Sequence, residues 1–353
     1  MRGSPSRPPR ILFAGTPAIA LPSLRMLAEK ALAENPPWAL AGVLTNPDKP
    51  RRRNGGAEPT DAGRAAAELG EAFSRLGRAV PAVLKYDTLK VEAREAAAAL
   101  SPDLLVSFAY GRIFGPRFLG LFPLGGINVH PSLLPRYRGP SPIQEAILRR
   151  DAVTGVTVQR IAGEMDTGNI LGRETIALTG RETAETLSET AAAAGAGVLQ
   201  KVLEDLAAAV RSGSAAVPEG LPQTGEASYC SLIGKDSGII DWFRSAAEID
   251  AQVRAYYPWP LARTGHNGQT LNILRALPWE GLPWEGKPEI PPGLSREPGR
   301  VLGIDKKTGI LIQTGNGILS VSLLQYQTRK ALPWQSFING ARDFTGSRLT
   351  GGT

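Results

Sequence analysis

Two polar side chains lie in an apolar stretch near the middle of the chain. Asn128 and His130 lie two residues apart, flanked by Ile127, Val129 and Pro131. In a β-strand such residues project from the same face, and proline ends the strand because it lacks an N–H donor. We therefore expect one strand face to present an amide and an imidazole where the strand meets a loop, the usual place for reactive groups in an open α/β sheet.

A carboxylate downstream completes a candidate reactive set. Asp166 lies in GEMDTG, residues 163–168, a segment typical of a turn. An imidazole can take or relay a proton, a carboxylate can orient it and support its charge, and an amide can donate to an oxyanion. Asn128, His130 and Asp166 therefore suffice for acyl transfer to an amine. The alternative is that Asn128 and His130 are ordinary strand-end residues satisfied by the backbone.

Length and composition bound the class of protein. The 353 residues exceed what one core usually holds and indicate two domains. With 42% hydrophobic and 21% charged residues, the composition is that of a soluble globular protein. The single cysteine, Cys230, excludes an intramolecular disulfide framework and leaves no cluster for zinc. We therefore expect no metal. Because neither a membrane span nor a signal peptide is evident, we also expect a cytoplasmic protein.

The first part of the chain predicts alternating strands and helices. Residues 10–15, RILFAG, and 39–45, ALAGVLT, predict buried strands, and apolar residues recur with helical spacing between them over 21–32. This βαβ order favours a mostly parallel α/β sheet. A dinucleotide site is disfavoured because Gly15 stands alone where G-x-G-x-x-G would be needed. A long helix over 183–209 closes the first domain, which we place at 10–209.

The composition changes after this helix. Residues 211–227 are rich in glycine, proline and serine without periodicity, so we place a linker at 210–228. Beyond it, short strand-like pieces alternate with turns, which is typical of a small β-barrel, and we place the second domain at 229–353. This region carries 14 Lys and Arg against 10 Asp and Glu. The net charge of +7 permits a polyanionic partner.

Several longer strings resemble one enzyme family. INVHPSLLPRYRG at 127–139, TGVTV at 154–158 and MDTGNIL at 165–171 resemble the 10-formyltetrahydrofolate-dependent formyltransferases. FAGTP at 13–17 and the appended C-terminal region are most similar to the methionyl-tRNA formyltransferase family. The resemblance covers about residues 10 to 349. It implies a Rossmann-like, mostly parallel formyltransferase domain followed by a smaller, OB-like β-barrel that contacts tRNA.

The resemblance also implies roles for the reactive set. The α-amine of methionyl-initiator tRNA would attack the formyl carbon of 10-formyltetrahydrofolate, the donor co-substrate, with no metal involved. Asn128 and protonated His130 would stabilise the tetrahedral oxyanion, and Asp166 would hold His130 and support its charge. We expect a monomeric enzyme with these two substrates and no membrane partner.

The resemblance implies two binding loops as well. Ser132, Leu133, Leu134 and Pro135 match the folate loop of the family, where the two leucines would clasp the flat ring. The segment NPDKPRRRNGG, residues 46–56, matches an insertion loop that approaches the acceptor end of the tRNA. Its essential arginine falls on Arg53, and Arg52 could share the role because the flanking residues depart from the family pattern. Taken alone, such a run would more often be a solvated surface.

Three other functions are compatible with parts of this pattern. A formyltransferase for an amino-sugar nucleotide or a purine precursor would share the Asn, His and Asp set but would not need the C-terminal domain or the basic loop. A formyltetrahydrofolate hydrolase would pass the formyl group to water. An RNA-binding protein without enzymatic activity would use the barrel and leave the three polar residues unexplained.

Overall fold

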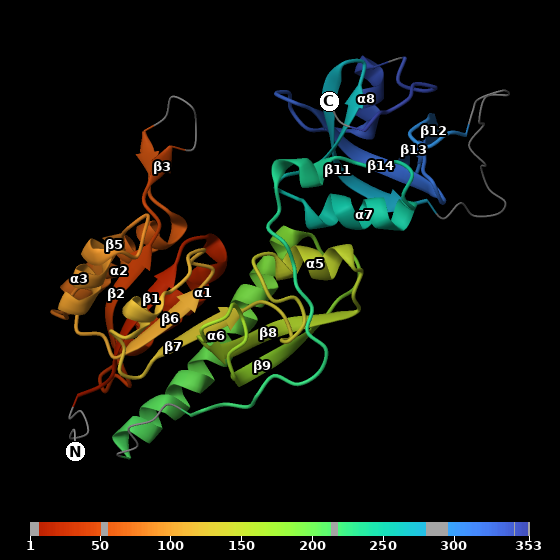
Figure 1. Cartoon of the computed structure of the whole chain (residues 1–353). Helices are drawn as coiled ribbons and strands as arrows, with labels where there is room; N and C mark the ends of the chain where they lie inside the picture. Colours follow the sequence, from red (N-terminus) through yellow and green to blue (C-terminus); the bar gives the residue numbers. More distant parts are fainter. Residues whose placement is uncertain (1–6, 51–55, 213–217, 280–295, 342, 352–353) are drawn as a thin grey trace. The chain divides into compact units, whose positions relative to one another are not determined.

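The computed structural model describes residues 7–50, 56–212, 218–279, 296–341 and 343–351 (Figure 1). Contacts divide the chain into two compact units. The first comprises Met1–Pro142, Val153–Ala177 and Ser188–Cys230, and the second comprises Ile143–Ala152, Leu178–Leu187 and Ser231–Thr353. Two short stretches, Ile143–Ala152 and Leu178–Leu187, group with the second unit. The units are therefore not continuous in sequence, unlike the domains placed from the sequence.

The first unit is built on a seven-stranded sheet. Its order is β5-β2-β1-β6-β7-β8-β9, in which β8 pairs antiparallel with both β7 and β9 and all other neighbouring strands pair in parallel. The strands are β1 (Arg10–Gly15), β2 (Ala39–Thr45), β5 (Ala82–Lys85), β6 (Leu104–Phe108), β7 (Gly126–His130), β8 (Val153–Arg160) and β9 (Ile170–Ala177). β1 and β6 are almost wholly buried, as their continuous apolar sequences require in a parallel sheet covered on both faces. The predicted α/β class is confirmed.

Helices pack on this sheet through small and apolar residues. They are α1 (Leu21–Ala31), α2 (Asp61–Arg75), α3 (Val91–Ala99), α4 (Pro116–Leu119) and α6 (Ala184–Arg211), with a 3-10 turn η1 (Ala18–Ala20). The part of α6 in the first unit approaches β7 closely at Gly195, where a Cβ would lie 3.0 Å from Val129 Cγ1. A core cluster on this sheet includes Leu12, Leu105, Phe118 and Phe122. Val129 of β7 therefore packs against α6, and Leu105 of β6 packs in this cluster.

A small antiparallel ladder lies on either side of residues 51–55, which are outside the described residues. β3 (Lys49–Pro50) pairs with β4 (Ala57–Glu58), and Asp48 Oδ2 before it is 2.7 Å from Lys85 Nζ at the end of β5. Arg52 and Arg53, predicted to bind tRNA, lie outside the described residues.

The second unit contains an antiparallel sheet of order β10-β11-β14-β13-β12, with β15 beside β14. Its strands are β10 (Ala262–His266), β11 (Gln269–Pro278), β12 (Val301–Asp305), β13 (Gly309–Gln313), β14 (Ile318–Tyr326) and β15 (Leu332–Pro333). The unit also holds most of α5 (Pro142–Leu148), the turn η2 (Lys235–Gly238), α7 (Ala246–Ala255) and α8 (Trp334–Gly340). Ser245 caps α7 by accepting from Glu248 N at 3.3 Å.

The core of this unit is formed by alternating strand residues and the inner faces of α7 and α8, including Ile249, Ile273, Val321 and Phe337, with Trp242 from the turn before α7. The predicted second, smaller domain built on β-strands is confirmed as this antiparallel sheet. Within the described part of the chain, no helix combines the length and apolarity that a membrane crossing requires.

Candidate active site

The end of β7 and the adjacent strand β8 present a polar face. In the antiparallel ladder between them, Asn128 is opposite Gln159 and His130 is opposite Thr157. Directly opposed residues place their side chains on the same face of the sheet, and the residues alternate with apolar ones such as Val129 and Val158. All but Asn128 are buried, with Gln159 only 1% exposed. This pairing therefore creates a protected polar patch of four side chains.

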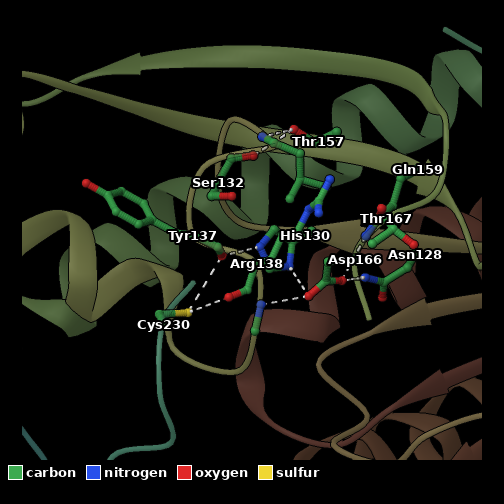
Figure 2. Close-up of polar contacts among 12 residues, drawn as sticks. Asn128, His130, Ser132, Tyr137, Arg138, Thr157, Gln159, Asp166, Thr167 and Cys230 are labelled. Atoms are coloured by element: carbon green, nitrogen blue, oxygen red, sulfur yellow. Dashed lines mark hydrogen bonds and ion pairs between the residues drawn. The ribbon is translucent and has the colours of Figure 1, made fainter. Parts of the chain in front are cut away.

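Asp166 reaches this patch from the connection between β8 and β9 (Figure 2). Its Oδ2 lies 3.5 Å from His130 Nδ1 and accepts from Gly139 N at 2.9 Å. Its Oδ1 accepts from Gln159 Nε2 at 2.8 Å and from Asn128 Nδ2 at 3.4 Å. The three residues selected from the sequence thus converge on one small volume, where the carboxylate is held by donors on both oxygens.

Burial and hydrogen bonding define the state of the His130 ring. Its Nε2 is 2.9 Å from the carbonyl oxygen of Tyr137, which can only accept, so we assign the proton of the neutral ring to Nε2. Burial lowers the pKa of His130 below its ordinary value of 6.5, although Asp166 and the Tyr137 carbonyl act in the opposite direction. With a pKa below 6.5, the resting ring is neutral at neutral pH. The sequence left this resting state open and named the protonated ring only as the species that stabilises the oxyanion during the reaction.

This charge state gives a direct prediction for proton magnetic resonance. The chain contains two histidines, and burial also lowers the pKa of His266, whose Nδ1 is 2.7 Å from the Tyr326 hydroxyl. We expect both histidine Hε1 signals of the folded protein to titrate with midpoints below 6.5. The His266→Gln variant assigns the two signals. In urea-unfolded protein both midpoints should return to about 6.5, and a folded-state midpoint for His130 above that value would contradict the assignment.

The predicted folate loop follows His130 directly. Thr157 Oγ1 donates to Ser132 O at 2.7 Å and accepts from Leu134 N at 3.2 Å, and Ser132 Oγ donates to Arg136 O at 2.6 Å. Ser132 and Leu134 are fully buried, at 0% and 1% exposure. The resemblance implies the same contact with the folate ring for both leucines, but the Leu134 side chain packs in the interior. Leu133 is the one of the pair that keeps partial exposure.

The connection between β8 and β9, which carries Asp166, is held by a close backbone approach between Gly168 and Arg160. A Cβ at Gly168 would overlap the carbonyl oxygen of Arg160, whereas nothing lies within 4 Å of the corresponding position at Gly163. The Gly168→Ala substitution must therefore displace the turn. Since a displacement of about 1 Å can cost about 100-fold in rate, we expect kcat to fall by about 10- to 100-fold.

The Gly163→Ala variant is the matched control in the same connection, and it should retain the wild-type kcat. Steady-state formyl transfer and thermal unfolding of both variants provide the measurement. Equal rates for the two variants would show that the approach at Gly168 does not position Asp166.

Two polar residues that contact Asp166 were not selected from the sequence. Gln159 lies on a strand that the alternation of residues 153–161 predicts. Its amide comes two residues after Thr157 and so projects from the same strand face, which was the available signal. Gln223 donates to the Asp166 carbonyl oxygen at 2.8 Å. It lies in a stretch whose composition indicates a linker, so the local sequence gives no signal for its contact.

Comparison with protein families matches both halves of the chain. The formyl transferase family model matches residues 14–203, and the model of the formyl transferase C-terminal domain matches residues 232–342. A methionyl-tRNA formyltransferase of Treponema denticola is 43% identical over 335 residues, which cover 95% of this chain and 98% of that protein. The methionyl-tRNA formyltransferase of Borrelia duttonii is 35% identical over 96% of this chain and 98% of its own length.

Solved structures share the fold at lower identity. HypX from Aquifex aeolicus in complex with tetrahydrofolic acid matches 95% of this chain and 48% of its own chain, with a TM-score of 0.57 and 16% identity. An N-formyltransferase from Helicobacter canadensis, in complex with folinic acid and dTDP-3-aminofucose, matches 89% of this chain and 98% of its own, with a TM-score of 0.54 and 19% identity. From the family models and the full-length relatives, the chain belongs to the formyltransferase family, and it is similar over nearly its whole length to the methionyl-tRNA formyltransferases.

Proposed function

We propose that this chain transfers the formyl group of 10-formyltetrahydrofolate to the α-amino group of methionyl-initiator tRNA. The observation that carries the proposal is the 43% identity to a methionyl-tRNA formyltransferase across both domains. The N-formyltransferase from Helicobacter canadensis is 19% identical and supports the common fold alone. The convergence of Asn128, His130 and Asp166 supports the same chemistry from the geometry. The proposal places the enzyme in the cytoplasm, as a monomer.

The proposed reaction begins when the amine nitrogen attacks the formyl carbon and the carbonyl electron pair moves onto oxygen. Asn128 Nδ2 has one described hydrogen bond, a long one of 3.4 Å to Asp166, so its second N–H is available to the oxyanion. His130 is neutral and takes the amine proton. Asp166 Oδ2 then stabilises the imidazolium.

Collapse of the tetrahedral intermediate completes the transfer. The bond between the formyl carbon and N10 of the folate breaks, and N10 gains a proton, which can come from His130 or from water. The products are formylmethionyl-tRNA and tetrahydrofolate. In this scheme the ring becomes charged only during the reaction, which fits its burial better than a permanent charge would.

We propose that the loop of Ser132, Leu133, Leu134 and Pro135 binds the folate. Leu133 would supply the apolar contact to the ring, while buried Ser132 and Leu134 hold the loop in shape through Thr157. Arg53 and Arg52 remain the proposed contacts to the acceptor end of the tRNA. The β3–β4 ladder and the Asp48–Lys85 ion pair would support the loop that carries them.

The deciding experiment offers a formyl-labelled donor to four acceptors in parallel. These are charged initiator tRNA, charged elongator methionyl-tRNA, a dTDP-amino sugar and water alone. We expect label on the initiator methionyl-tRNA at a kcat/KM well above that for the other acceptors. Label on the sugar nucleotide would establish a sugar formyltransferase, and formate release without an amine would establish a hydrolase. Binding of tRNA without any transfer would leave an RNA-binding protein.

A further inference from the structure

The residues after α6 lie along the first unit as an ordered strap. We use this name for Leu221–Cys230. Leu221 exchanges two backbone hydrogen bonds with Ile170 at 2.8 and 2.9 Å, and Ser228 and Cys230 both pair with Arg138 at 2.8 Å. The Ser228 hydroxyl also accepts from Tyr137 N at 2.9 Å. The strap therefore touches both the connection that carries Asp166 and the loop that follows His130.

Gln223 joins these two loops through its side-chain amide. Its Nε2 donates to the carbonyl oxygens of Asp166 and Gly168, both at 2.8 Å, and approaches Gln159 Oε1 at 3.3 Å. Its Oε1 accepts from Arg138 Nη2 at 2.7 Å and from Arg138 Nε at 3.2 Å. Because the guanidinium can only donate and the carbonyls can only accept, the orientation of this amide is fixed.

The Asp166 backbone needs such support. Its φ of +56° lies in the left-handed region, which a residue other than glycine adopts at a cost and keeps only when its surroundings determine it. The two donors of Gln223 bind the carbonyls on either side of Thr167, and so close this turn around the strained residue. The orientation of the Asp166 carboxylate toward His130 and Asn128 depends on the same turn.

We propose that Gln223 is a positioning residue for formyl transfer, which holds the Asp166 turn and Arg138 in a fixed relation. The proposal rests on the proposed function. It gives a residue of the strap, which follows α6 in the sequence, a role in positioning the catalytic residues of the first unit. Gln223 itself touches no reacting atom. Its effect passes through the placement of Asp166, which acts on the charge of His130.

The test compares Gln223→Leu and Gln223→Glu with the wild-type chain. The leucine variant removes the donors and the acceptor, and the glutamate variant keeps the acceptor for Arg138 but sets a carboxylate against two carbonyl oxygens. We expect kcat to fall by about 10- to 100-fold in both variants, as for a displacement of about 1 Å, with the KM for both substrates within about threefold. Gln200→Leu is the matched control, because among the described residues Gln200 donates to Glu204, one turn further along α6 and away from the site.

A second measurement separates positioning from stability and needs no activity. Asp166 raises the pKa of His130 against the effect of burial, so displacement of its carboxylate in folded Gln223→Leu should move the His130 Hε1 midpoint to lower pH. Gln200→Leu should leave this midpoint in place. An unchanged midpoint or an unchanged kcat in folded Gln223→Leu would overturn the proposal. Absence of transfer by the wild type would instead refute the proposed function, and the titration would still test Gln223.

Discussion

The His130→Gln variant is expected to lose about 10³-fold in kcat. General acid–base catalysis by a positioned group contributes roughly 10²- to 10⁴-fold, and His130 has both the buried location and the carboxylate partner that this role needs. Glutamine can still donate to the Tyr137 carbonyl, so the loop keeps its contact. It cannot accept a proton at neutral pH. Single-turnover transfer of labelled formyl groups measures the loss without interference from product release.

His266→Gln is the matched control, since it makes the same exchange at the other histidine, which is also buried. His266 lies in the core of the second unit against Tyr326 and Phe344. This variant should keep a kcat within about threefold of the wild type once thermal unfolding shows that it is folded. Similar losses in the two variants would mean that the effect of His130→Gln is structural, and a fully active His130→Gln would remove His130 from the mechanism.

The parts of the site that could be predicted are those encoded by local periodicity. The spacing of Asn128 and His130 follows from the two-residue repeat of a strand, and proline fixes where the strand ends. The alternation of residues 153–161 and 170–177 defines a hairpin, whose tip must lie at the same edge of the sheet. These features place Asp166 near His130 without any knowledge of the tertiary structure.

The remaining parts depend on contacts between distant segments. Gln223 lies within a stretch rich in glycine and proline that resembles a linker, and its hydrogen bonds go to residues more than fifty positions earlier. The neutral resting state of His130 results from burial, which no local pattern reveals. Leu133 and Leu134 are adjacent and chemically identical, yet the fold exposes part of one and buries the other. Local sequence thus locates the reacting groups, and the fold determines their charge and support.

The Asp166→Asn variant should lower kcat by about 10²- to 10³-fold. Both carboxylate oxygens accept hydrogen bonds, from Gln159 on one and Gly139 on the other, whereas an asparagine has a single acceptor oxygen. One donor would therefore face the new amide, and the imidazolium formed in the reaction would lose its counter-charge. Asp205→Asn, at an exposed position on α6, removes the same charge away from the site and should leave kcat unchanged.

The pH dependence of kcat/KM in the Asp166→Asn variant should shift in a direction that a structural defect would not produce. Since His130 must be neutral to accept the proton, kcat/KM of the wild type rises with pH through the lowered pKa of His130 and then levels off. Asp166 raises this pKa, so its neutralisation should shift the acidic limb to lower pH while the plateau falls. A limb that stays in place, or moves to higher pH, would show that the Asp166 carboxylate does not act on the charge of His130.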